Sequence, residues 1–167
     1  MLKMSHKTLI IISGLIWLAV GSFLLPLGLN FLMSAAENVR FQADQYPLLN
    51  LLMSLSPQVE NAIIFLISAG LLVGFFKGRF VLGKSAYKGV ERIRNFSDPT
   101  EFKNIYSAKY YILLACMMGL GFSMKYLGIP ADVRGFIDVA IGAALINGAM
   151  VYFRLAFEKK HAVKSYA

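Results

Sequence analysis

The stretch RGFIDVAIGAALINGAMVYF, residues 134–153, is apolar and rich in small side chains, yet it contains one aspartate, Asp138, and one asparagine, Asn147. The whole chain is 57% hydrophobic, with a mean hydropathy of +0.61. Soluble domains contain about 45–50% apolar residues, so the excess predicts segments that lie in lipid. We therefore interpret this stretch as part of a membrane-spanning helix. The presence of two polar side chains inside such a helix requires an explanation.

Four apolar segments of this kind occur along the 167 residues. Runs of about 18 or more apolar residues are typical of spanning helices, because a helix bonds all its backbone groups internally in hydrocarbon. The sequence lacks the repeated alternation that a membrane barrel needs. It thus predicts an all-α, polytopic membrane protein: a single domain of four transmembrane helices at about residues 8–33, 57–76, 110–126 and 135–157.

Local sequences predict where some helices begin. Ser56 followed by Pro57 is an N-cap with proline at the first helical position. Asp98-Pro99-Thr100-Glu101 combines a capping aspartate, a proline and a glutamate at the third position, so we expect the third helix to begin near Pro99. The segment PLLNLLMSLS, residues 47–56, is too apolar for a free loop and predicts a short interfacial helix.

Basic residues predict the orientation of the chain. Of the 17 lysines and arginines, two precede the first span, eight lie between the second and third spans, and four lie in the last turn of the fourth span or after it. Only Arg40, Lys125 and Arg134 lie elsewhere. The positive-inside rule then places both termini and residues 77–109 in the cytoplasm. This asymmetry explains the formal net charge of +8, and nucleic acid is not an expected partner.

The segment KGRFVLGKSAYKGVERIRNF, residues 77–96, predicts a basic helical extension of the second span, within cytoplasmic residues 77–109. Val90, Ile93 and Phe96 recur at helical spacing and predict an apolar face. The cations opposite are explained by topology alone, or they form a surface for anionic lipid headgroups or a partner protein. These cations are Lys77, Arg79, Lys84, Lys88, Arg92 and Arg94.

Small residues recur at four-residue spacing on three of the predicted spans. Residues four apart share one helix face, and small side chains there let two helices approach closely. We expect these faces to pack within one chain in preference to forming a dimer interface. The expected packing residues are Gly70, Gly74 and Gly78, then Ala115, Gly119 and Ser123, and finally Ala140, Ala144 and Gly148.

Two of the predicted spans also resemble each other. GLIWLAVGSFLL (residues 14–25) and GFIDVAIGAALI (residues 135–146) are identical at five of twelve positions. Inverted repeats build many transporters, but a duplication of two helices would pair the first span with the third. We interpret the similarity as coincidence within a small alphabet of membrane residues.

Polar residues within the spans are candidates for an intramembrane site. Arg134 precedes Asp138 by four residues, so an ion pair near the positive end of the helix explains Asp138 structurally. An ionisable group inside a membrane helix is equally a candidate for binding a cation or proton. Asn147 and Asn30 are expected to bond across to another helix or to contact a solute. These four residues form the candidate intramembrane polar site.

Catalysis has little support, because the sequence contains no catalytic or phosphate-binding motif. One cysteine, Cys116, and two histidines offer no metal-ligand spacing, so no enzyme, cofactor or metal is expected. We expect a channel or carrier for an ion or small solute, acting as a homo-oligomer because four helices seldom enclose a pathway alone. The alternative is a non-transporting accessory or scaffold subunit that binds a partner protein or anionic lipid. A short chain without an organelle address favours a bacterial inner (plasma) membrane.

Overall fold

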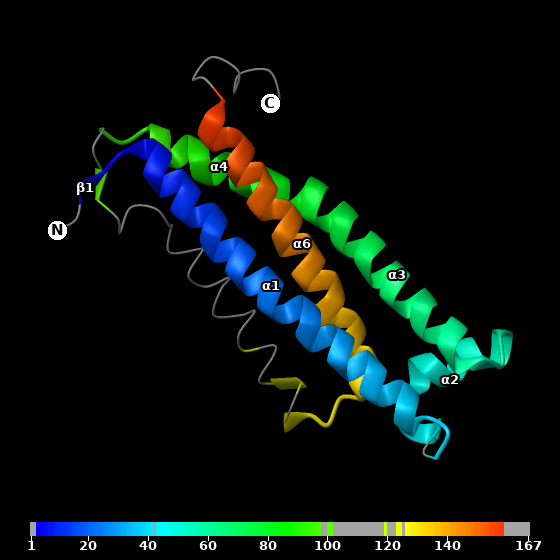
Figure 1. The fold of residues 1–167 in the computed structure, drawn as a ribbon. Helices are drawn as coiled ribbons and strands as arrows, with labels where there is room; N and C mark the ends of the chain where they lie inside the picture. Colours follow the sequence, from blue (N-terminus) through cyan, green and yellow to red (C-terminus); the bar gives the residue numbers. More distant parts are fainter. Residues whose placement is uncertain are drawn as a thin grey trace.

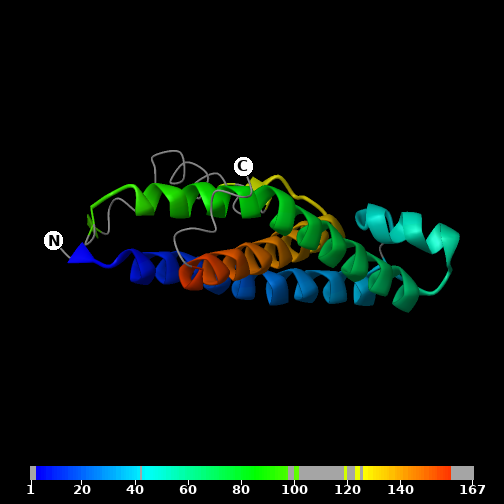
Figure 2. The same cartoon turned by 90° about the horizontal axis from the view of Figure 1, so that it is seen from above.

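Three long helices dominate the computed structural model, which describes residues 3–41, 43–97, 100–101, 119, 123–124 and 126–158. They are α1 (His6–Asn38), α3 (Val59–Lys77) with its continuation, and α6 (Ala131–Phe157). The helices lie side by side, with α6 between α1 and α3 (Figures 1 and 2). Two short elements, η1 (Ala43–Gln45) and α2 (Pro47–Leu55), connect α1 to α3.

Membrane crossing is possible for three helices by length and composition: His6–Asn38, Val59–Arg94 and Ala131–Phe157. At about 1.5 Å per residue, even the shortest is roughly 40 Å long, more than the hydrocarbon core of about 30 Å. The prediction of a helical protein is therefore confirmed, with three helices that are long and apolar enough to span a membrane. The third predicted span, residues 110–126, lies outside the described residues except at positions 119, 123, 124 and 126.

The helix α3 continues beyond the predicted end of the second span at Phe76. It runs through a π-helical segment, η2 (Gly78–Leu82), into α4 (Gly83–Arg94). Local π-helical turns of this kind are inserted into α-helices without breaking them. The predicted extension beyond residue 77 is thus helical as far as Arg94, where α4 ends; residues 102–109 lie outside the described residues. The N–H of Asn95 closes the last turn on the carbonyls of Glu91 and Arg92.

A two-residue strand follows α4, at the position where the sequence predicted the start of a helix. Strand β2 (Thr100–Glu101) pairs antiparallel with β1 (Lys3–Met4). The prediction of a helix beginning near Pro99 is therefore wrong at these two residues. A capping motif stabilises a helix end by only about 1 kcal/mol, and backbone hydrogen bonds to a distant strand replace it here.

Other helix ends differ from the predictions by a few residues. The helix α1 begins two residues early, because the Ser5 hydroxyl accepts a hydrogen bond from the Thr8 N–H. The helix α6 begins at Ala131, four residues before the predicted 135. The Ser56–Pro57 pair does not start α3, whose N-cap is Gln58. The short helix predicted at residues 47–56 is present as α2.

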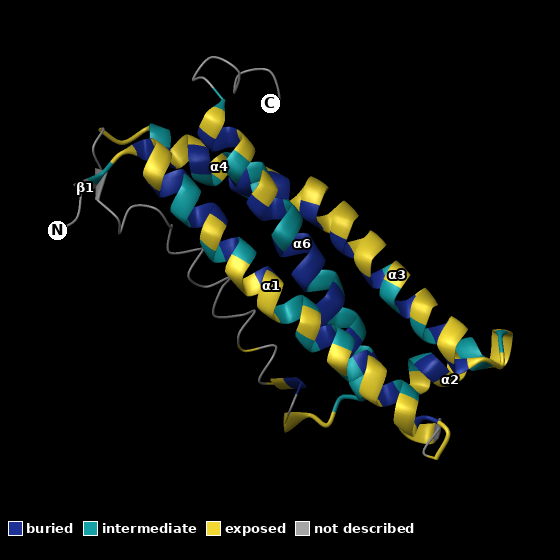
Figure 3. Ribbon diagram, in the orientation of Figure 1, coloured by how far each residue is buried: buried dark blue, intermediate teal, exposed yellow. Residues whose placement is uncertain are grey.

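Buried side chains form two clusters, one toward each end of the three-helix bundle. One cluster joins the start of α1, α4 and the end of α6, and includes Leu9, Val90 and Tyr152. The other joins the end of α1, α2 and the first halves of α3 and α6, and includes Leu32 and Leu66. Figure 3 shows that α6 is mostly buried or intermediate, whereas α1 and α3 have exposed outer faces. Helix α6 is therefore the centre of the bundle.

Candidate membrane-embedded site

Arg134 and Asp138 form an i,i+4 ion pair on α6, with 3.9 Å between Arg134 Nε and Asp138 Oδ2. The pair is enclosed, since the side chains are only 20% and 6% exposed. The guanidinium also lies over the ring of Phe31 on α1, 4.3 Å from its centroid. Arg134 Nε is buried and has no hydrogen-bond partner among the described residues. A buried ion pair without good hydrogen bonds is poorly compensated for its lost hydration, which keeps Asp138 a candidate for binding a cation or proton.

Asp132 is fully buried and holds α2 onto α6, a role that the sequence analysis did not predict. Its Oδ2 accepts hydrogen bonds from the N–H groups of Leu48, at 2.7 Å, and Leu49, at 3.0 Å. Its Oδ1 accepts a third from the N–H of Val133, at 2.8 Å. A carboxylate at the positive end of α2 satisfies donors that the helix leaves unpaired. The only sequence signal was a charged residue next to an expected membrane span.

Asn147 does not bond across to another helix in the part of the chain that the structure describes. Its Nδ2 donates to the carbonyl of Ala143, one turn earlier in α6, at 2.9 Å. Asn30 is exposed on α1. The structure therefore brings Arg134 and Asp138 together but joins neither asparagine to them, so the four predicted residues do not form one polar cluster.

The glycine stripe of α3 faces α6. A Cβ added at Gly74 would lie 2.5 Å from the carbonyl oxygen of Ala140, and one added at Gly78 would lie 2.6 Å from that of Ala144. At Gly70 the nearest atom is a Val139 methyl group, 3.1 Å away. Two backbones in such close contact tolerate no side chain between them. This stripe is used for packing within one chain.

The remaining predicted packing residues have other surroundings. Gly148 faces α1, where an added Cβ would lie 2.5 Å from the Trp17 ring. Ala115 lies outside the described residues, whereas Gly119 and Ser123 are described and exposed. The predicted stripe on α6 therefore serves two neighbours: its alanines pack against α3 and its glycine against α1.

A second glycine seam joins α1 and α6, and four-residue spacing did not reveal it. Gly14, Gly21 and Gly28 recur every seven residues on α1. A Cβ at Gly28 would lie 2.8 Å from the carbonyl of Gly135, and one at Gly21 would lie 2.9 Å from that of Gly142. Seven residues are two helical turns, so this spacing also marks one face. The similarity between residues 14–25 and 135–146 thus has a packing reason at its glycines.

The helix α4 buries its apolar face against α1 and α6. Val90 and Ile93 are each only 1% exposed and belong to the cluster that contains Leu9 and Tyr152, whereas Phe96 lies outside this face and is 37% exposed. The predicted cations Lys77, Arg79, Lys84, Lys88 and Arg92 are exposed.

Arg94 differs from the other cations of the predicted basic surface. Its Nη2 donates to the carbonyls of Leu155, at 2.8 Å, and Glu158, at 3.3 Å. These carbonyls lie at the end of α6, where helical oxygens have no partner within the helix and carry partial negative charge. Arg94 therefore closes α6, and it is half-buried rather than presented to the surroundings.

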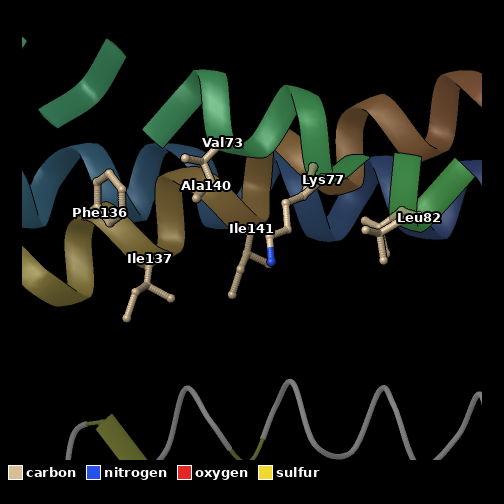
Figure 4. Close-up of a pocket in the computed structure, with 9 residues that line it drawn as sticks. Val73, Lys77, Leu82, Phe136, Ile137, Ala140 and Ile141 are labelled. Carbon is tan, nitrogen blue, oxygen red and sulfur yellow. The ribbon is translucent and has the colours of Figure 1, made fainter. Parts of the chain in front are cut away.

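A cavity of about 340 Å³ lies between α3–η2 and α6 (Figure 4). Neither Asp138 nor Asn147 lines it. Its walls are apolar, and the amine of Lys77 reaches down beside Ile141 in Figure 4. Aliphatic and aromatic side chains of both helices form the walls: Val73, Val81, Phe136, Ile137, Ala140 and Ile141.

Comparisons with protein families, with characterised proteins and with solved structures find no match for this chain. Within the described residues, no three His, Cys, Asp or Glu side chains gather where they could hold a metal ion. The chemistry that the described residues offer is that of exposed cations, an apolar cavity with an ammonium group, and the buried Arg134–Asp138 ion pair.

Proposed function

We propose that the chain is a four-span protein of the inner (plasma) membrane, with both termini in the cytoplasm, and that it binds acidic phospholipid without transporting a solute. The observation that carries this proposal is the two-faced character of α4. Its apolar residues Ala86, Val90 and Ile93 are buried in the protein, whereas its cations Lys84, Lys88 and Arg92 are exposed and can approach lipid headgroups.

The distribution of charge between the two ends of the bundle supports this orientation. At one end, Lys7 lies over the ring of Phe157, with 4.7 Å between its Nζ and the ring centroid, and Arg94 closes the same end of α6. At the other end, Arg40 pairs with Glu60 at 3.4 Å. The exposed cations of α4 therefore lie at the end of the bundle where α1 begins and α6 ends. The positive-inside rule assigns this end to the cytoplasm.

The expected strength of lipid binding follows from the number of free cations. A lysine or arginine near an anionic leaflet adds about 1 kcal/mol of attraction, which falls off within a Debye length. Lys84, Lys88 and Arg92 are exposed and make none of the ion pairs found among the described residues. Together they are expected to enrich acidic lipid around the protein in a salt-dependent manner.

Lipid enrichment is measured by reconstituting the protein in nanodiscs that contain equal parts of phosphatidylcholine and phosphatidylglycerol. Native mass spectrometry after mild release then reports which lipids stay bound. We expect phosphatidylglycerol to be enriched on the wild type and depleted on a variant in which Lys84, Lys88 and Arg92 are all changed to Gln. Arg40→Gln, at the opposite end, is the control and keeps the enrichment. Equal retention of both lipids by the wild type contradicts the proposal.

Orientation is measured separately by cysteine labelling, after Cys116 is changed to Ser. Single cysteines at Asp44 and at Lys88 are exposed positions on opposite ends of the bundle. We expect a membrane-impermeant reagent added to intact cells to label the cysteine at position 44 and not the cysteine at position 88. Labelling of both from the same side contradicts the four-span arrangement.

A second candidate function is a homo-oligomeric channel or carrier for an ion or small solute. Asp138 favours it, because this carboxylate is buried inside a membrane helix and its partner Arg134 stays 3.9 Å away. Ion flux into proteoliposomes tests it: Asp138→Asn abolishes the flux and Asp44→Asn leaves it unchanged. A wild type without flux for alkali cations, protons or chloride excludes this candidate.

A further inference from the structure

The depth of Lys77 in the bundle is set by how α3 packs on α6. Gly74 meets Ala140, and Gly78 meets Ala144. Lys77 therefore lies beside the middle of α6, a 27-residue helix from Ala131 to Phe157. The positive charge that sequence reasoning assigned to the cytoplasmic end of the second span instead lies halfway along its neighbour.

The neighbouring helices are uncharged at this level. Helix α6 has no charged residue between Asp138 and Arg154, and α1 has none between Lys7 and Glu37. The contact of Gly21 with the backbone of α6 near Gly142 places the middle of the uncharged part of α1 at this level too. An ammonium group at such a depth is expensive unless lipid thins locally or an anion pairs with it.

The described residues provide no such anion. The ion pairs among them join Arg40 to Glu60, Arg134 to Asp138 and Arg154 to Glu158, and none involves Lys77. Among the described residues, Lys77 is also the only charged one that lines the cavity between α3–η2 and α6. A ligand that pairs with Lys77 must therefore be anionic at one point and apolar along the rest of its length.

The cavity extends from Lys77 in both directions along α6. Ala140, Ile137 and Phe136 line it toward the start of α6, and Val81, Leu82 and Ala144 line it toward the end (Figure 4). In the proposed orientation the second part lies nearer the cytoplasmic side, and the first part leads toward the outer half of the bilayer. A cytoplasmic-leaflet lipid that enters from the Leu82 side directs its acyl chain along the cavity toward Phe136. The cavity volume of about 340 Å³ is of the size that accommodates part of one chain rather than a whole lipid.

We propose that this cavity is a discrete binding site for one acidic phospholipid of the cytoplasmic leaflet. Lys77 pairs with the phosphate, and one acyl chain lies against the apolar walls from Val73 to Phe136. The lysine stem extends along the apolar surface and the bilayer thins locally at this groove, so that the ammonium meets the phosphate below the level of the surrounding headgroups. This inference rests on the proposed lipid-binding function and narrows it to one cation and one groove.

The charge half of the site is tested by counting the phosphatidylglycerol molecules that stay bound in native mass spectrometry, using the nanodiscs described above. We expect Lys77→Gln to lose one tightly held lipid, with about fivefold weaker retention, and Lys77→Arg to keep it. Lys84→Gln removes the same charge from an exposed position outside the cavity and keeps the tight lipid. Equal losses for Lys77→Gln and Lys84→Gln overturn the discrete site and leave the general cationic surface intact. No loss for either variant also overturns the discrete site, and the triple Gln variant described above tests the general cationic surface separately.

The groove half is tested by filling the cavity from a position that is already exposed. Val73 lines the cavity and is 40% exposed, whereas its neighbour Leu72 is 59% exposed and does not line it. Val73→Trp is expected to displace the tight lipid and Leu72→Trp to leave it in place, with both variants giving the helical circular dichroism of the wild type. Retention of the lipid by Val73→Trp overturns the acyl-chain assignment.

Discussion

The α1–α6 seam makes a quantitative prediction, because one substitution can be placed at a closed and at an open glycine. A Cβ at Gly28 would lie 2.6 Å from the backbone nitrogen of Val139 and 2.8 Å from the carbonyl oxygen of Gly135. A Cβ at Gly83, in α4, would have its nearest neighbour 3.7 Å away, which is ordinary contact. Gly28→Ala and Gly83→Ala thus add the same atom to a helix in two different surroundings.

The magnitude follows from the distances. Ordinary contact starts at 3.4 Å, so the two backbones must separate by about 0.8 Å at Gly28, enough to lose a quarter to a half of each nearby contact energy. Overpacking of this kind costs about 1–3 kcal/mol. Both variants gain about 1 kcal/mol from the better helix propensity of alanine. The difference between their free energies of unfolding therefore isolates the clash and is expected to be about 1–3 kcal/mol.

The measurement is unfolding of the purified protein in mixed micelles by increasing the fraction of denaturing detergent, followed by circular dichroism. Gly28→Ala is expected to unfold at a lower detergent fraction than the wild type, and Gly83→Ala at the same or a higher one. A difference between the two variants below about 0.5 kcal/mol, the range of ordinary surface substitutions, would refute the close approach of α1 and α6. The double variant Gly28→Ala with Gly135→Ala is expected to cost less than the two single changes added, since the helices have already moved apart.

Three further predictions concern polar side chains. Asp132→Ala is expected to lower the free energy of unfolding by about 2 kcal/mol and to speed amide exchange in α2, while the exposed Asp44→Ala changes neither; protection of α2 equal to the wild type would contradict its role. Arg94→Gln is expected to speed amide exchange in the last turn of α6, whereas Lys88→Gln does not; the reverse order would show that Arg94 does not close the helix. Asn147→Leu is expected to change the unfolding free energy by no more than about 0.6 kcal/mol, because its amide bonds within its own helix; a larger loss in the same detergent titration would reveal a bond to another helix.

The long apolar helices could be predicted from the sequence, because the length of an apolar segment is a local property. The stretches now found in α1 and α6 were located to within a few residues, and PLLNLLMSLS is helical as α2. The Arg134–Asp138 ion pair could also be predicted, since residues four apart share a face of the same helix. Each of these features depends on neighbours in the chain.

Features that depend on distant neighbours could not be predicted. The partners of Asp132 are 83 and 84 residues away, and nothing near it in the chain indicates them. Thr100 and Glu101 carry a helix-start signal, yet they pair with the N-terminal strand. A local preference of about 1 kcal/mol is too weak to resist such contacts.

The amino-acid sequence by itself determined that this protein has long apolar helices and an excess of cations between two of them. Only the tertiary structure decided the depth of those cations, because the level of Lys77 depends on which residues of α6 meet the glycines of α3. The physical reason is that hydropathy records how each residue is solvated, whereas the relative height of two helices is set by the few places where their backbones can touch.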